Sequence, residues 1–114
     1  AAHSISYPLT INHRIPHGIA SSMPILKLLS INKVEIESEL SKILLKLGLH
    51  DLGSLVNLIR EIPRGTIKYS LRAWGVRRKD LDFLVSQSFT KGRMDNNIVD
   101  LSKKDVYEIL ECIF

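Results

Sequence analysis

The sequence is poor in cysteine and in long apolar runs. Its single cysteine, Cys112, excludes a disulfide within the chain and fits a reducing, cytoplasmic setting. The apolar neighbours Ile109, Leu110 and Ile113 favour a packed thiol over a reactive one. No apolar run approaches the roughly 20 residues that a membrane-spanning helix needs, so no membrane partner is expected. The opening residues lack a secretion signal and an initiator methionine, which suggests that the chain was cut from a longer polypeptide.

Common cofactor-binding motifs are also missing. The sequence contains no Gly-x-Gly-x-x-Gly, no phosphate-binding loop and no Cys-x-x-Cys. The coenzyme fingerprint of an oxidoreductase is therefore not found in these residues.

Strand patterns are almost absent, and the apolar residues recur with the period of a helix. We expect helices over 2–12, 16–29, 32–47, 51–62, 78–89 and 102–113. The third and fourth carry apolar stripes that predict burial: Ile36, Leu40, Ile43, Leu44 and Leu47, then Leu52, Leu55, Val56, Ile59 and Ile62. A chain of 114 residues forms one domain with one core. The sequence thus predicts an all-α bundle of about six helices.

Capping residues and prolines set the expected helix boundaries. Pro16 suits the first turn of a helix, and Pro24 is expected to kink that helix, with Ser21 or Ser22 satisfying the freed carbonyl. Capping is expected from three sites: Asn32 with Glu35, Asp51, and Ser102 with Asp105. Gly48 should end the third helix, and Ser70 and Gly75 should bound a short turn. Residues 91–100 are expected to form a loop.

The net charge of +4 is concentrated between Arg60 and Lys79. One interpretation is a patch that binds nucleic acid or phosphate, which would suit a stand-alone helical module with a protein or nucleic-acid partner. The other is a solvated face, which we favour because the charges spread over a helix end, a turn and a helix start. No nucleic-acid partner is therefore expected.

Three of the four histidines lie in the first 17 residues. Neutral imidazole is the commonest metal-binding side chain, but spacing alone makes each histidine more often a surface or capping residue than a ligand. His13 precedes His17 by four residues, yet Pro16 interrupts any helix between them, so their rings should not share a face. His13 is expected to be exposed or to line a cleft, and His50 is a loop residue before the Asp51 cap.

The order of several short motifs resembles the iron-dependent (group III) alcohol dehydrogenases. His3, Pro8-Leu9 and Pro16-His17-Gly18 resemble the metal-binding signature of that family. The resemblance continues through nearly all 114 residues in the family's order, with Leu71-Arg72-Ala73-Trp74-Gly75-Val76, Asp80-Leu81-Asp82, Gly92-Arg93-Met94-Asp95-Asn96-Asn97 and Leu101-Ser102-Lys103-Lys104-Asp105-Val106.

The resemblance implies the fold of the dehydroquinate synthase-like C-terminal domain of iron-containing alcohol dehydrogenases. Residues 1–114 would form this helical metal-binding domain, with the N-terminal coenzyme-binding domain absent. His3 and His17 would bind Fe²⁺ or Zn²⁺, and an Asp and a His from an earlier helix, which cannot be placed here, would complete the site. NAD or NADP would be bound mainly by the missing domain.

The intact enzyme would interconvert an alcohol with an aldehyde or ketone, whereas these residues alone would be inactive, and a homodimer is compatible with exposed helices. Tyr7 stands where many family members carry a second histidine that relays a proton. It would either hydrogen-bond substrate or coenzyme, as a catalytic-site residue, or form a cleft wall. A purely structural domain that has lost metal binding is the remaining alternative.

Overall fold

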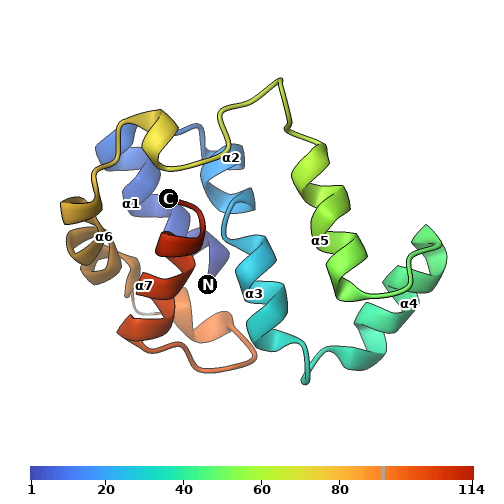
Figure 1. The fold of residues 1–114 in the computed structure, drawn as a ribbon. Helices are drawn as coiled ribbons and strands as arrows, with labels where there is room; N and C mark the ends of the chain where they lie inside the picture. Colours follow the sequence, from blue (N-terminus) through green and yellow to red (C-terminus); the bar gives the residue numbers. More distant parts are fainter. Residues whose placement is uncertain (91) are drawn as a thin grey trace.

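The computed structural model describes residues 1–90 and 92–114, which form helices and no strand (Figure 1). The all-α prediction is confirmed. The α-helices are α1 Ala2–His13, α2 His17–Ser22, α3 Ile25–Asn32, α4 Glu37–Leu47, α5 Leu52–Glu61, α6 Leu81–Ser88 and α7 Lys103–Cys112. Three short 3₁₀ turns accompany them: η1 Arg72–Trp74, η2 Arg78–Asp80 and η3 Met94–Asn96.

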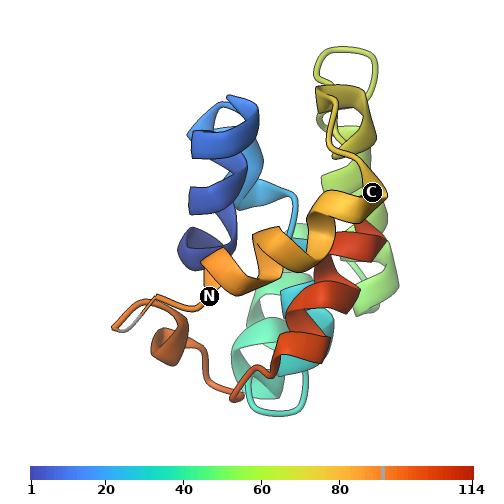
Figure 2. The same cartoon turned by 90° about the vertical axis from the view of Figure 1, so that its left-hand side faces the viewer.

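The core lies where α1 packs against α2 and α6, and α6 packs against α7 (Figures 1 and 2). The fully buried apolar side chains are Ile5, Leu9, Ile15, Ala20, Met23, Leu71, Leu81, Leu84, Val106, Ile109 and Leu110. On α6, Leu81, Leu84, Val85 and Ser88 form a buried stripe that faces this core. This half of the molecule holds α1 and α2 in place and so determines the geometry of the histidines.

The helical hairpin of α4 and α5 is less buried than its apolar stripes predicted. Only Leu40 and Leu55 are buried, whereas Ile43 and Leu47 are about half exposed and Ile62 is 73% exposed. The main contacts of α5 are with α3 and α4, so α3 connects the hairpin to the core (Figure 1). The stripes correctly mark two amphipathic helices, but one neighbour cannot cover both apolar faces.

Most predicted caps are confirmed. Asp51 accepts a hydrogen bond from the Ser54 backbone N–H at 2.7 Å, and Ser102 and Asp105 form a reciprocal capping box on α7. Gly48 ends α4 with φ +66°, a left-handed conformation that glycine adopts without a Cβ clash. Gly75 ends the short turn η1 in the same way.

The predicted capping pair Asn32 and Glu35 is wrong. Asn32 is the last residue of α3, and α4 begins two residues after Glu35, at Glu37. The Asn32 side chain instead exchanges two hydrogen bonds with the Asn97 side chain, at 3.0 and 2.9 Å. The Asn32 side chain therefore bonds a residue 65 positions away in the sequence and does not cap a helix.

The single kinked helix predicted over 16–29 is two helices, because the chain breaks at Met23 and Pro24. Proline has no N–H to continue the helical hydrogen bonds and clashes with the preceding turn. Ser21 and Ser22 do donate to backbone carbonyls, but to those of His17, Gly18 and Ile19.

The loop predicted over 91–100 contains the turn η3, while Lys91 lies outside the described residues. In the described parts of the chain, every helix is too short or too polar to cross a membrane.

Candidate metal centre

The structure brings the rings of His3 and His17 together. His3 lies in the first turn of α1 and His17 opens α2 directly after Pro16. Nε2 of His17 lies 3.1 Å from Nδ1 of His3, and the ring centroids are 4.9 Å apart with 26° between the planes. Since α2 packs against α1, the two imidazoles meet where the helices are in contact.

Ser6 contacts both histidines from within α1. Its buried hydroxyl donates to the His3 carbonyl oxygen at 3.0 Å, and its Oγ lies 3.5 Å from Nδ1 of His17. Because the hydroxyl hydrogen is used by the carbonyl, the arrangement suits a protonated Nδ1 that donates to Oγ. That tautomer of His17 leaves the lone pair on Nε2, facing His3.

This geometry fits a pair of metal ligands. Two nitrogens that bind one ion at about 2.0–2.1 Å, as in zinc sites, lie about 2.8–3.4 Å apart when the angle between them at the metal is about 90–109°. The observed separation of 3.1 Å falls within this range. Metal-ligating histidines also commonly donate their other ring N–H to a second group, the position that Ser6 occupies.

The two imidazoles are not a closed site. Within residues 1–90 and 92–114, no group of three or more His, Cys, Asp or Glu side chains comes together. A catalytic metal site uses at least three protein ligands. His13 is half-buried near the far end of α1, and His50 is exposed between α4 and α5, so neither joins the pair.

The histidine pair opens onto a cleft of about 500 Å³, lined by Ala1, Ala2, His3, Tyr7, His17, Arg93 and Asn96. Tyr7 is 49% exposed, and the guanidinium carbon of Arg93 lies 5.4 Å from the centroid of its ring. The sequence did not single out Ser6 or Arg93. Ser6 follows His3 by one helical turn, a spacing that could have indicated it, whereas the approach of Arg93 is a tertiary contact with no local signal.

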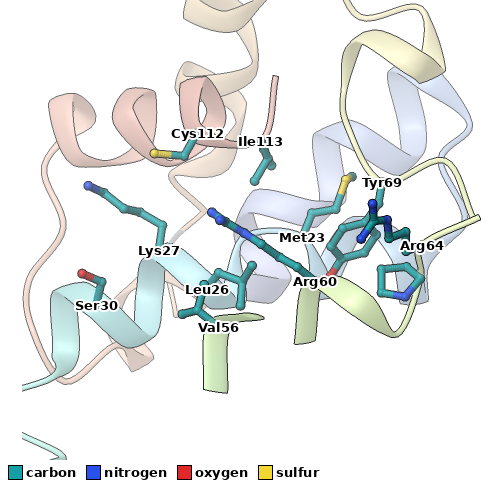
Figure 3. Close-up of a pocket in the computed structure, with 11 residues that line it drawn as sticks. Met23, Leu26, Lys27, Ser30, Val56, Arg60, Arg64, Tyr69, Cys112 and Ile113 are labelled. Atoms are coloured by element: carbon teal, nitrogen blue, oxygen red, sulfur yellow. The ribbon is translucent and has the colours of Figure 1, made fainter. Parts of the chain in front are cut away.

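A second cavity, of about 520 Å³, lies between α3, α5, the connection through Tyr69 and the end of α7 (Figure 3). Apolar side chains such as Met23 and Val56 line it together with the cations Lys27, Arg60 and Arg64. It shares no lining residue with the histidine cleft.

Cys112 also lines the second cavity and is exposed, so the predicted packed thiol is wrong. As the last residue of α7, it lies beyond the face that Ile109 and Leu110 bury in the core. The apolar neighbours in sequence therefore point to a different side of the helix.

Three of the seven cations between Arg60 and Lys79 form ion pairs among the described residues. Arg64 contacts Glu61 at 2.9 Å, Arg77 contacts Asp80 at 3.1 Å and Arg78 contacts Glu111 at 2.6 Å. Hydrogen bonds from the Arg77 side chain and backbone hold the pKa of Asp80 below its usual value. Three of the cations are thus balanced by acids of the same chain, which fits the solvated face.

Comparison with known proteins accounts for the fold and identifies the family. A solved structure described as "Crystal structure analysis of 1,3-propanediol oxidoreductase" superposes on 99% of this chain with a TM-score of 0.83 and 18% sequence identity, which shows a common fold. The match covers 32% of that longer chain. Curated protein sequences give no match. The family model "Fe-containing alcohol dehydrogenase family, C-terminal" matches residues 1–114 throughout, and the chain therefore belongs to the iron-containing alcohol dehydrogenases.

Proposed function

We propose that residues 1–114 are the C-terminal helical metal-binding domain of an NAD- or NADP-linked alcohol dehydrogenase. In this proposal His3 and His17 supply two ligands to a catalytic Fe²⁺ or Zn²⁺. The 3.1 Å separation of their facing nitrogens is the observation that carries the proposal. The coenzyme-binding domain and the remaining metal ligands lie outside these residues, in keeping with the 32% coverage of the solved relative.

The substrate would be a small alcohol, aldehyde or ketone. When bound, a divalent metal supplies Lewis-acid stabilisation of a carbonyl oxygen, and a nicotinamide coenzyme supplies hydride. The residues of this chain then hold and orient: His3 and His17 bind the metal, and Ser6 fixes the tautomer of His17. Tyr7 reaches the same cleft with a phenol that can donate or accept a hydrogen bond to the substrate or coenzyme.

Residues 1–114 alone would lack a complete metal site and a bound coenzyme. Two imidazoles hold a divalent ion weakly. The sequence also has no Gly-x-Gly-x-x-Gly motif and no phosphate-binding loop that would bind a hydride-donating coenzyme. We therefore expect residues 1–114 alone to be inactive. A homodimer of the intact enzyme is a further expectation.

The test is the metal content of the intact protein that carries this chain, measured by elemental analysis after purification. His3→Ala and His17→Ala should each lose most of the bound metal and the alcohol dehydrogenase activity. His50→Ala is the matched control, because it removes an exposed imidazole in the α4–α5 connection. Metal content that stays at the wild-type value in both His3→Ala and His17→Ala would reject the proposal and leave a purely structural domain.

A further inference from the structure

Arg93 places a guanidinium in the histidine cleft without an acidic partner. Three other arginines of the chain contact carboxylates within 4 Å: Arg64, Arg77 and Arg78. Among the residues that the structure describes, Arg93 has no such contact. Its guanidinium carbon lies over the face of the Tyr7 ring, 5.4 Å from the centroid.

The nearby acid is already engaged elsewhere. Asp95, two residues further on, accepts a hydrogen bond from the Gly92 backbone N–H at 3.0 Å. The described residues that line the cleft include no carboxylate, and Arg93 is their only side chain with a permanent charge. Among the described residues the N–H donors of this guanidinium have no hydrogen-bond acceptor, so they can bind an anion that enters the cleft.

The position of Arg93 relates this charge to the histidine pair. Tyr7 follows His3 by one helical turn, so the two side chains leave α1 on the same side, with roughly 5–6 Å between their Cβ atoms. The guanidinium lies over Tyr7, and the imidazoles lie one turn earlier. A ligand a few carbon atoms long could therefore reach both places in the cleft.

The geometry points to Arg93 as a specificity-determining residue that binds an anionic group on the substrate, such as a carboxylate, phosphate or phosphonate. The preferred substrates would then be short aldehydes or alcohols with an anionic group at the end opposite the reacting carbon. This inference rests on the proposed function. The pyrophosphate of the coenzyme is also an anion. The KM of the coenzyme, measured beside the kcat/KM of each aldehyde, distinguishes the two.

The test compares 4-oxobutanoate with butanal, which have equal chain length and differ in one carboxylate, as substrates of the intact holoenzyme. Wild type should have the higher kcat/KM for 4-oxobutanoate. Arg93→Met should lower that value by about 10- to 100-fold, mainly through KM, because a hydrogen bond to a charged group contributes about 1.5–3 kcal/mol. The kcat/KM for butanal should fall far less than that for 4-oxobutanoate, and the KM of the coenzyme should stay at its wild-type value. Arg93→Lys should restore part of the loss.

Arg72→Met is the matched control, because Arg72 also lies over an aromatic ring, Phe114 at 4.9 Å, but outside the cleft. Its kinetics should match wild type. An equal loss for both aldehydes in Arg93→Met would reduce Arg93 to a structural role and overturn the inference. A raised KM for the coenzyme with unchanged discrimination between the aldehydes would assign Arg93 to the coenzyme and also overturn it.

Binding measured without turnover separates this inference from the proposed function. By calorimetry, 4-hydroxybutanoate should bind the intact wild-type protein more tightly than 1-butanol, and Arg93→Met should abolish the difference. If no aldehyde is reduced, the proposed function fails, and the calorimetry still decides the role of Arg93. Equal binding of the two alcohols to wild type would overturn the inference.

Discussion

Replacing Ser6 by alanine should weaken metal binding by the intact protein about 10- to 100-fold, which corresponds to about 1.4–2.7 kcal/mol. The Ser6 hydroxyl is fully buried, donates to the His3 carbonyl oxygen at 3.0 Å and lies 3.5 Å from Nδ1 of His17. Without it, the His17 ring loses the group that favours a lone pair on Nε2. The ring can then turn or adopt the other tautomer, and both changes compete with metal binding.

Ser4→Ala is the matched control. Ser4 lies on the same helix and is equally buried, but its hydroxyl has no hydrogen-bond partner among the described residues. Its removal should leave metal affinity unchanged. The protein should be as stable as wild type or more stable, because a buried hydroxyl without a partner costs about 1–3 kcal/mol.

Competition with a chromophoric chelator at fixed pH gives the dissociation constant for Zn²⁺ in each variant. The affinity of Ser6→Ala for Zn²⁺ should be lower than that of Ser4→Ala. Equal weakening in both would attribute the effect to the packing of α1, and wild-type affinity in Ser6→Ala would show that the serine does not orient the ring.

Three further predictions concern stability and reactivity. Leu9→Ala should lower the free energy of unfolding in urea by about 2–5 kcal/mol because Leu9 is fully buried, whereas Leu45→Ala, at a residue 82% exposed, should change it by less than about 0.5 kcal/mol. The side-chain and backbone hydrogen bonds of Ser102 lower the pKa of Asp105. Asp105 therefore stabilises the fold above its unfolded pKa of about 3.9, and this contribution is lost as the pH falls through the lower folded pKa. Urea titrations between about pH 5 and 2 should thus show a shallower acid loss in Asp105→Asn than in wild type. Cys112 should react with a maleimide in the native protein, as seen by peptide mapping, and a protected thiol would contradict its exposed position.

The sequence predicted α6 and α7 well because local and tertiary signals agree there. The Ser102–Asp105 capping box fixes the start of α7, and the apolar stripe that follows meets the stripe of α6 in the core. Where such agreement is missing, prediction failed. Asn32 has the side chain of a good cap, but its hydrogen bonds go to Asn97, a partner that no local pattern reveals.

The stripes of α4 and α5 failed for another reason. Periodicity shows that one side of a helix is apolar, but it does not identify the surface that covers that side. Among the described residues, the main neighbour of this hairpin is α3, and Ile62 stays 73% exposed. The burial that the pattern predicted would require a partner surface beyond α3.

The candidate site was only partly accessible from the sequence. Spacing alone did not favour His3 and His17 as ligands, and the family resemblance did. Ser6 carried no motif of its own, and the motif that contains Arg93 did not indicate its contact with Tyr7. The contact between Arg93 and Tyr7 depends on how the segment around η3 folds back onto α1, which is a property of the whole chain.

The short connection between α1 and α2 holds the two imidazoles against each other. Arg14 ends α1 in the left-handed conformation, with φ +56°, and its N–H donates to the Thr10 carbonyl at 3.0 Å. Ile15 is fully buried and anchors the turn, and Pro16 directs the chain into α2. The helix pair therefore fixes His17 against His3 during folding. Ligands fixed in this way lose little conformational entropy on binding. A metal whose other ligands come from outside these residues would therefore bind to two imidazoles that are already ordered.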